Sequence, residues 1–485
     1  MSVTHLNCIN GAWVPSAGGE TYEQRNPADL TQVTARFQKS TLADTRAAVA
    51  AAKQAFPAWA ALSVYQRADY LNRALQLMKE RIESIAAVIT AENGKTLKEA
   101  RGEVVSAIKE MEFQINEGVR LGGEMLPTTQ AGVLAYQIRR PIGPVAVIAP
   151  WNFPFNVPAR KITPALMAGN TCVLKPAQLT SGAGVEFVRL YVDAGLPPGV
   201  LNLVTGSGKL IGDELVTHPD IHAITFTGST EVGMAIHEKA APGLKRTQLE
   251  MGGKNPLVVM ADADLEAAAA SAALAAFACA GQWCISTSRA LVHRSVLAPF
   301  LELLKGQVAK IVVGAGTEAA TTMGPVCGEA QLKGVLKGIE KAKAEGARLL
   351  CGGEQLTAGG KGAGCFVAPT VFTEVTPEMS IAQEEIFGPV LAVMVFDDFE
   401  EAVTIANGVR YGLGASIYTR DLAQAMAFVN RIEAGLAHVN MHTAYKEPQF
   451  SFGGVKLSGH GIPEAGKTGI EFFTEHKTIF IKPVA

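Results

Sequence analysis

The sequence predicts an α/β fold in which helices cover both faces of parallel β-sheets. From residue 145 onward, short runs rich in β-branched residues alternate with helix-length segments, which is the pattern of repeated βαβ units. The chain has 485 residues, of which 48% are hydrophobic, and this length is typical of about three domains. Charged residues make up 18% and the formal net charge is −2. These values argue against disorder and against a nucleic-acid-binding protein, which normally carries a basic surface.

The first third of the chain is predicted to be helical. Charged and apolar residues at helical spacing indicate three helices, over residues 41–56, from near Gln66 to Glu92, and from Leu97 to about Arg120. Gly94 separates the last two helices.

The first parallel sheet is predicted from five strands: Val145–Ala149, Thr171–Leu174, Val200–Val204, Ala223–Phe226 and Thr247–Glu250. Ligands bind beyond the carboxyl ends of such strands, and each strand carries a polar group or glycine there. Two of these ends, at Gly206-x-Gly208 and at Gly228-Ser229, lead into helix N-termini that can hold a phosphate. Either turn alone is equally well explained as structural, but two at one sheet edge favour a ligand site.

A second α/β region follows the first. An alanine-rich helix is expected from near Asp264 to Gly281, and strands and helices continue to about Gly461. We expect Gly408 and Gly435 to end the helices over residues 400–407 and 422–433 in the left-handed conformation. Residues 133–138 and 470–482 alternate as strands outside the main sheets, and they could pair or extend the sheet of a neighbouring subunit.

Two stretches, residues 141–159 and 267–288, carry no charge over about the width of a membrane. Five prolines interrupt the first, and the second is mostly alanine and serine without the large aliphatic residues that drive insertion. We therefore predict no membrane span. The seven cysteines include no CxxC pair, and the first residues show no secretory signal, so we expect a cytoplasmic protein with reduced thiols.

Two residues stand out as candidates for chemistry. Cys284 lies in a polar, glycine-containing loop where backbone amides could favour a thiolate and a developing oxyanion, although a buried, unreactive thiol is the more common situation. Glu250 ends a buried strand, where a carboxylate is either held in an ion pair or kept as a general base with a raised pKa. Nothing in the sequence has the spacing of metal ligands.

Six motifs, in order along the chain, together resemble the aldehyde dehydrogenase superfamily of NAD(P)-dependent, hydrolytic enzymes: Pro150–Pro154, Lys175–Ala177, Phe226–Ser229, Leu249–Lys254, Gly281–Cys284 and Glu384–Pro389. The general run is most similar to succinate- and ketoglutarate-semialdehyde dehydrogenases. The resemblance implies a Rossmann-like cofactor domain (1–123 and 143–251), an α/β catalytic domain (252–467) and small β oligomerisation arms (124–142 and 468–485). It also implies a homodimer or homotetramer.

The resemblance implies three catalytic roles. Cys284 matches the nucleophile that attacks the aldehyde carbon, and Asn152 together with the Cys284 amide matches the oxyanion hole. Glu250 matches the base that activates the hydrolytic water. Because relatives that pass the acyl group to coenzyme A typically lack this carboxylate, Glu250 favours a free acid as the product.

The cofactor contacts implied by the resemblance are Ile148, Trp151, Lys175, Gln178, Gly208, Phe226, Gly228, Ser229, Val232, Met251, Gly252, Glu385 and Phe387. NAD-preferring relatives often carry a glutamate at the position of Gln178, where it repels a 2′-phosphate. Since Gln178 is neutral, we expect either NAD or NADP to serve, with NADP accepted.

The substrate contacts are expected to be Arg160, Trp283 and Phe452. Arg160 matches one arginine of the carboxylate clamp in semialdehyde dehydrogenases, but the second position is Ala278. Lys446 could replace the missing charge, although a solvated loop lysine is the simpler expectation.

The sequence departs from the family around residues 458–464, where one residue is inserted and an arginine is missing, so we assign Glu464 no catalytic role. We predict that the protein oxidises a small aldehyde, with succinate semialdehyde or a similar semialdehyde as the first choice of substrate. The alternatives are an aromatic or medium-chain aliphatic aldehyde dehydrogenase, a cofactor-independent cysteine acyltransferase, and a binding or structural protein recruited from this fold.

Overall fold

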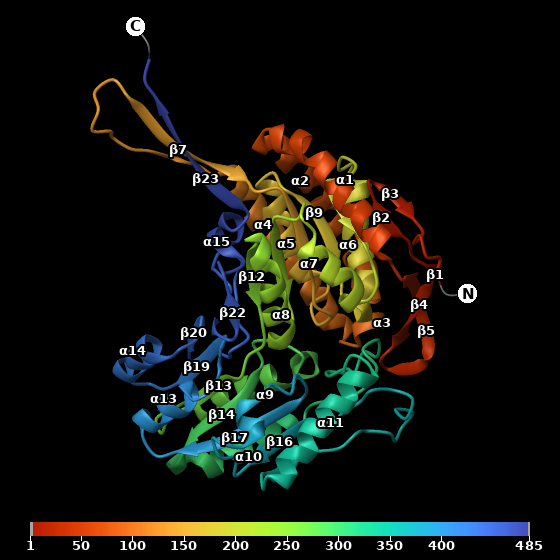
Figure 1. The fold of residues 1–485 in the computed structure, drawn as a ribbon. Coiled ribbons are helices and arrows are strands. Elements are labelled where there is room, and N and C mark those ends of the chain that lie inside the picture. The colour runs from red at the N-terminus through yellow and green to blue at the C-terminus, as the bar shows by residue number, and fades with distance from the viewer. Residues whose placement is uncertain (1–2, 484–485) are drawn as a thin grey trace.

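Two large sheets, one above the other in Figure 1, form the centre of the molecule. The computed structural model describes residues 3–483. The first sheet has eight strands, in the order β22 (Gly459–His460), β12 (Arg246–Glu250), β11 (Ala223–Thr227), β8 (Pro144–Ile148), β9 (Thr171–Lys175), β10 (Leu201–Leu203), β2 (Asn7–Ile9) and β3 (Ala12–Val14). The five strands from β12 to β10 are parallel, as predicted, and antiparallel strands flank them.

The second sheet has seven strands, in the order β15 (Arg348–Cys351), β16 (Thr370–Thr373), β17 (Val390–Phe396), β14 (Thr287–His293), β13 (Asn255–Val259), β19 (Gly414–Tyr418) and β20 (Leu436–Val439). All neighbours are parallel except β15 and β16. The chain crosses from the first sheet to the second at residues 251–254 and returns later to add β22 to the first sheet.

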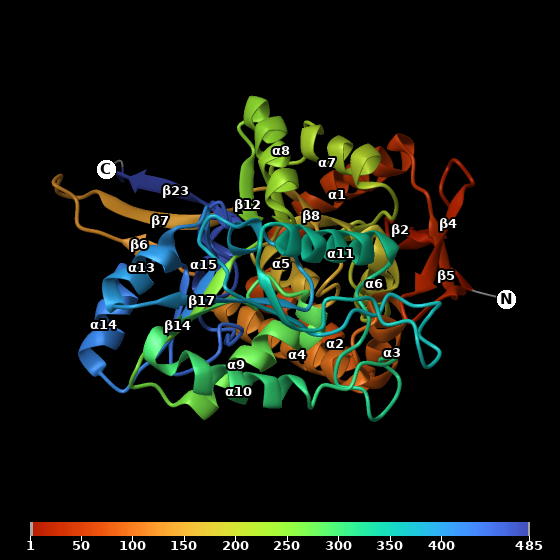
Figure 2. The ribbon, with the colours of Figure 1, turned by 90° about the horizontal axis from the view of Figure 1, so that it is seen from below.

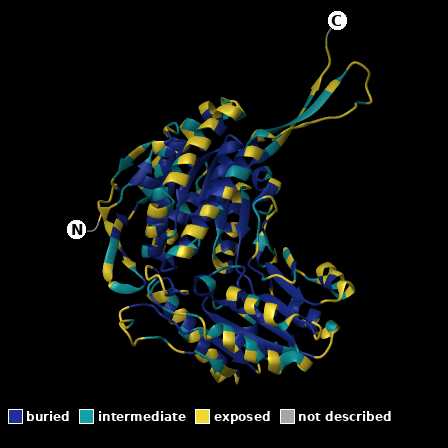
Figure 3. Ribbon diagram, turned by 180° about the vertical axis from the view of Figure 1, so that it is seen from behind, coloured by how far each residue is buried: buried dark blue, intermediate teal, exposed yellow. Residues whose placement is uncertain are grey.

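Helices cover both faces of each sheet, which confirms the predicted fold class. One face of the first sheet packs against α1 (Leu42–Ala61), α7 (Asp213–Thr217) and α8 (Thr230–Ala240). The other face packs against α2 (Val64–Glu80), α3 (Ile82–Asn93), α4 (Leu97–Val119), α5 (Asn156–Met167) and α6 (Ser181–Asp193). The second sheet is covered by α9 (Leu265–Phe277), α10 (Leu297–Val308), α11 (Glu329–Ala344), α13 (Phe399–Asn407) and α14 (Leu422–Arg431). Buried residues accordingly fill both sheets (Figure 3).

The first third contains strands as well as helices, so that part of the prediction was wrong. β1 (Val3–Thr4), β5 (Asp29–Gln38) and β4 (Thr21–Asn26) form a separate sheet. These strands are half-exposed and polar, so they lack the apolar runs that mark buried strands. The helix expected over residues 66–92 is broken at Arg81, whose backbone is not helical, into α2 and α3, and each of these packs separately against α4 and α6.

Of the two glycine endings expected for the later helices, the first was right in position and the second was wrong. Gly408 directly follows α13, as predicted, although its φ of −70° lies outside the left-handed region. α14 ends at Ile432, before Gly435. A Cβ at Gly435 would lie 1.7 Å from the carbonyl oxygen of Gly453, so close approach of two backbones requires this glycine.

The two strands expected outside the main sheets pair with each other. β7 (Leu134–Pro141) and β23 (Thr474–Ile481) are antiparallel over their whole length, and β6 (Glu124–Met125) joins β7. This three-stranded sheet projects from the body of the molecule in both views (Figures 1 and 2). Among residues 3–483, no helix is long and apolar enough to cross a membrane.

Candidate active site

Cys284 reaches the centre of the molecule through a sharp reversal of the chain after α9. The helix ends at Phe277, not at Gly281 as the sequence suggested. Cys279 and Ala280 then adopt left-handed conformations, with φ of 52° and 54°. Gly281 continues the turn with a φ of 68°, and a Cβ there would lie 2.1 Å from the Gly388 carbonyl oxygen. Because only glycine fits this contact, the loop that carries Cys284 is closely constrained.

Asn152 lies beside this loop. It follows β8, and its side-chain Nδ2 donates a hydrogen bond to the Gln282 carbonyl oxygen at 3.0 Å. Asn152 and Cys284 both line two adjoining cavities. A neutral amide donor is therefore held next to the thiol, where negative charge would develop on a substrate oxygen.

A buried ion pair holds the backbone of the Asn152 loop in place. Lys95 Nζ donates to the Asn152 carbonyl oxygen at 2.7 Å and to Glu103 Oε2 at 2.7 Å. The other oxygen of Glu103 accepts from the backbone amides of Phe155, at 2.8 Å, and Asn156, at 3.1 Å. Sequence reasoning missed this pair, and no motif or spacing that we recognised pointed to it.

Two cavities meet at Cys284. The smaller, about 380 Å³, is lined by the three predicted substrate contacts, Arg160, Trp283 and Phe452. The larger, about 780 Å³, is lined by all thirteen predicted cofactor contacts. The structure therefore brings every residue that was expected to touch a cofactor or substrate, within and outside the six motifs, to the walls of these two cavities.

The larger cavity suits a dinucleotide. Lys175 is 4% exposed, and the hydrogen bond found for its ammonium among the described residues goes to the Pro176 carbonyl at 3.0 Å. Burial lowers the pKa of Lys175 to about 8. Its remaining N–H groups are thus free to donate to a ribose hydroxyl. At the other wall, α8 begins at Thr230 with Ser229 as its cap, so that its first amides can meet a phosphate.

Close packing shapes the rest of this cavity. A Cβ at Gly228 would lie 2.4 Å from the Phe226 ring, and one at Gly252 would lie 2.0 Å from Glu385 Oε2. Glu385 accepts a hydrogen bond from the Gly253 amide at 3.0 Å, and burial raises the pKa of Glu385 to about 7. Only residues without a side chain leave the room that a cofactor needs here.

Glu250 is buried at the end of β12, and its Oε2 lacks a hydrogen-bond partner among the described residues. Burial raises the pKa of Glu250 well above 4.5, the nearby Glu464 raises it further, and Lys161 and Arg160 oppose the change. An unpartnered carboxylate with a raised pKa is equipped to accept a proton from water.

Glu464, to which we assigned no role, lies behind the cavity walls and contacts residues of the site. It forms ion pairs with Arg160, at 3.0 Å, and with Lys161, and it accepts a hydrogen bond from the Thr227 hydroxyl at 3.1 Å. The inserted residue is accommodated in the turn that leads to Glu464, with Gly461 at a φ of 84°. Allowing a shift of one residue in the family motif would have found Glu464, whereas Lys161 had no such signal.

Cys284 is surrounded by charged groups. Burial raises the pKa of its thiol to about 12, and Arg160 lowers it, whereas Glu385, Glu250 and Glu464 raise it further. The thiol is therefore protonated at neutral pH in this state, and a neighbouring base must remove its proton before attack.

Lys446 is not the solvated loop lysine that we expected. Its side chain is 19% exposed, lines the smaller cavity and forms a 2.7 Å ion pair with the buried Glu110. Arg160 lines the same cavity over the Phe452 ring, 4.4 Å from its centroid, and its Nη1 has no hydrogen-bond partner among the described residues. Ala278, at the position of the second arginine of the carboxylate clamp, also lines this cavity and carries no charge.

These features indicate a nicotinamide-dependent oxidoreductase. A thiol and an amide donor lie where a dinucleotide-sized cavity joins a smaller one, and a buried carboxylate, which lines neither cavity, is near enough to raise the pKa of the thiol. The model of the aldehyde dehydrogenase family matches residues 13–479. The chain therefore belongs to the aldehyde dehydrogenase family and is an NAD(P)-dependent aldehyde dehydrogenase.

Three comparisons place the chain within this family. It is 44% identical over 480 residues to an alpha-ketoglutaric semialdehyde dehydrogenase of Bacillus subtilis (strain 168), covering 99% of this chain and 98% of the relative. A solved structure described as an NADP dependent enzyme of E. coli superimposes with a TM-score of 0.96 at 36% identity, covering 99% and 98%. An NAD-dependent aldehyde dehydrogenase from Sinorhizobium meliloti gives a TM-score of 0.96 at 36% identity, covering 99% and 96%.

Proposed function

We propose that the enzyme oxidises a semialdehyde that carries a distant carboxylate, and releases a free dicarboxylic acid. The observation that carries this proposal is the cavity next to Cys284, whose walls present two cations, Arg160 and Lys446. The similar enzyme of Bacillus subtilis is named for alpha-ketoglutaric semialdehyde. We therefore place ketoglutarate semialdehyde beside succinate semialdehyde, our first choice, as the best candidates.

In the proposed reaction, Cys284 Sγ passes its proton to a water molecule in the cavity and attacks the aldehyde carbon. The Asn152 side chain and the Cys284 amide stabilise the negative charge on the oxygen of the thiohemiacetal. A bound nicotinamide supplies the acceptor for the hydride that leaves this carbon. Glu250 then takes a proton from water, which attacks the resulting thioester and releases the acid and the Cys284 thiol. Glu464, which is near Glu250 and paired with Lys161, can take up the proton that Glu250 received from water.

An aromatic or medium-chain aliphatic aldehyde is the second candidate for the substrate. It is favoured by the aromatic side chains on the cavity wall, Phe153, Trp283 and Phe452, of which the first two have ring centroids 5.1 Å apart. Burying a carboxylate is costly without a cation, whereas an apolar aldehyde has no use for one. The two candidate substrates therefore differ in whether their binding needs the positive charge of Lys446.

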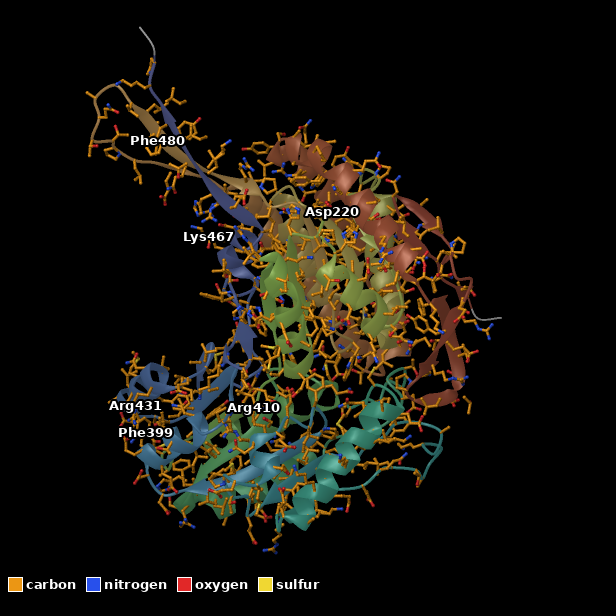
Figure 4. The ribbon with its side chains drawn as sticks, viewed as in Figure 1. Asp220, Phe399, Arg410, Arg431, Lys467 and Phe480 are labelled. Atoms are coloured by element: carbon orange, nitrogen blue, oxygen red, sulfur yellow. The ribbon has the colours of Figure 1, made fainter. Side chains whose placement is uncertain are left out.

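Replacing Lys446 with methionine should raise KM about tenfold for succinate and ketoglutarate semialdehydes, because a charge-assisted hydrogen bond is lost. KM for benzaldehyde should not change. Steady-state kinetics with these three aldehydes checks the prediction, and Lys467→Met serves as the control because Lys467 is an exposed lysine on α15 (Gly466–Glu471) outside both cavities (Figure 4). An equal change in KM for benzaldehyde would contradict an anionic substrate.

We propose that NADP is accepted along with NAD. Gln178 is exposed, lines the larger cavity near Lys175 and carries no charge that would repel a 2′-phosphate. Gln178→Glu should lower kcat/KM for NADP about tenfold or more through charge repulsion and leave the value for NAD nearly unchanged. Gln178→Ala, which adds no charge, is the matched control. A wild-type preference for NAD of about a hundredfold would contradict this proposal.

We also propose the division into a cofactor domain (1–123 and 143–251), a catalytic domain (252–467) and arms (124–142 and 468–485). The arms expose the apolar side chains of Met125, Leu126 and Phe480, which supports their use in a homodimer or homotetramer (Figure 4). None of the seven cysteines, all within residues 3–483, forms a disulfide, and reduced thiols suit a cytoplasmic location.

A further inference from the structure

Arg410 lines the cofactor cavity from the second α/β region, although no sequence motif singled it out. It lies between α13 and β18 (Tyr411–Gly412), a strand of a small two-stranded sheet, and near the end of α8 (Figure 4). Its side chain lines the larger cavity and is half-exposed. It thus faces a proposed cofactor from the wall opposite the first sheet.

The charges of this cavity are unevenly placed. Among the described residues that line it, Lys175 and Arg410 are the cations, and Glu231, Glu384 and Glu385 are the carboxylates. Lys175 is buried beneath the backbone of Gly208 and Gly212, beside the end of β9. Arg410 is therefore the cation that faces the N-terminal turn of α8.

The contacts of Arg410 leave much of its guanidinium free. Its Nη2 donates to the Tyr411 hydroxyl at 2.8 Å and lies 3.4 Å from Glu231 Oε1, on the first turn of α8. The side-chain hydrogen bonds found for Arg410 among the described residues all involve Nη2, so the other N–H groups of the guanidinium can reach a ligand. The Glu231 side chain is 70% exposed, and an ion pair this open to water is weak and easily exchanged.

A dinucleotide diphosphate carries two negative charges, whereas the N-terminus of a helix supplies about half of one positive charge. Glu231 and Glu385 add negative charge at the same place, and both are close enough to Arg410 that the three groups influence one another: burial raises the pKa of Glu385, Glu231 raises it further and Arg410 lowers it. A diphosphate against α8 therefore needs a further cation, and Arg410 is positioned to supply it.

We propose that Arg410 binds the diphosphate of the nicotinamide dinucleotide from the wall opposite α8, exchanging its ion pair with Glu231 for phosphate oxygens. This inference rests on the proposed cofactor site and adds to it a residue from the second α/β region, between α13 and β18. The diphosphate would then be held from both walls, by the amides of α8 and by a guanidinium.

The test is the binding of NADP, ADP and adenosine to the full-length enzyme without aldehyde, followed by isothermal titration calorimetry. Arg410→Met should raise Kd for NADP and for ADP by about tenfold, since each loses a charge-assisted hydrogen bond, and leave Kd for adenosine unchanged. Arg410→Lys should restore part of the affinity. Unchanged Kd values for NADP and ADP in Arg410→Met would overturn the proposal.

One control variant and one further variant test whether the change in Kd is specific to Arg410. Arg431 also pairs with a carboxylate, Glu400 at 2.6 Å, and lies over an aromatic ring, Phe399, but it is outside the cavity (Figure 4), so Arg431→Met should not change Kd. Glu231→Gln removes the carboxylate that competes with phosphate for Arg410, so it should lower Kd for NADP. If Glu231→Gln weakened binding as much as Arg410→Met, the ion pair alone would matter and the proposal would be wrong.

Failure of the inference is distinguishable from failure of the proposed cofactor site. If the wild-type enzyme bound NADP tightly and Arg410→Met bound it equally well, only the role of Arg410 would fall. If the wild-type enzyme bound no dinucleotide, the cofactor site itself would be overturned, and Arg410 with it.

Discussion

Replacing Cys284 with alanine will abolish aldehyde oxidation while the protein still folds and binds dinucleotide. Cys284 is the thiol at the junction of the two cavities, next to the Asn152 amide donor, and its loss removes the atom that forms the covalent intermediate. The rate should fall by about 10⁴-fold or more, as for other enzymes that lose their nucleophile. Alanine fills most of the same space, and Cys284 contributes no contact to Lys175 or to α8, so Kd for NADP should stay within about twofold.

The measurement is initial NADPH formation with a semialdehyde, together with dinucleotide binding by calorimetry. Cys351→Ala is the matched control, because Cys351 is a half-buried thiol on the edge strand β15 and lines neither cavity. Its activity should match that of the wild type. Turnover by Cys284→Ala above about 1% of the wild-type rate would contradict the assigned nucleophile, since no group of comparable reactivity remains at the junction.

Replacing Glu250 with glutamine will stop turnover after the first oxidation. Glutamine keeps the shape of the side chain but cannot accept a proton, so the thioester forms and then hydrolyses slowly. Rapid mixing should show one burst of NADPH per active site, followed by a steady rate about 10²- to 10⁴-fold below that of the wild type. Absence of a burst, with both phases slowed equally, would instead place Glu250 in the oxidation step.

The pH dependence of hydrolysis follows from the surroundings of Glu250. A base acts when deprotonated, and because burial and Glu464 raise the pKa of Glu250, the hydrolysis rate should be low at acid pH and increase through that raised pKa. Glu464→Gln should move the increase to lower pH, since it removes a like charge and leaves Lys161 and Arg160 without their anion. A pH profile of the steady rate after the burst checks both statements, and a shift to higher pH would contradict them.

Sequence patterns predicted the central part of the fold because its strands are buried on both faces and therefore apolar throughout. All five strands from β8 to β12 lie where their β-branched runs placed them. The polar strands β4 and β5 of the small separate sheet were not predicted, because one face of each meets water and no apolar run marks them. The break at Arg81 was not predicted, because charged and apolar residues follow a helical spacing on both sides of it, in α2 and in α3.

The residues of the candidate site likewise fall into some that the sequence predicted and others that it did not. Asn152 and Glu250 stand at the carboxyl ends of β8 and β12, where the topology of a parallel sheet brings side chains to one edge. Cys284 lies in the loop between α9 and β14, and its motif alone marked it as a candidate. Lys95, Lys161 and Lys446 carried no motif that we recognised, and each is buried against a carboxylate: Glu103, Glu464 and Glu110.

The sequence by itself determined the α/β architecture and the family, and it supplied the three candidate groups for the chemistry, because all of these depend on local patterns and on their order along the chain. Only the tertiary structure decided which charges surround those groups. Glu464 lies 303 residues from Lys161, and Lys446 lies 336 residues from Glu110. A buried charge is stable only beside its partner, and the folded chain alone shows which partner that is.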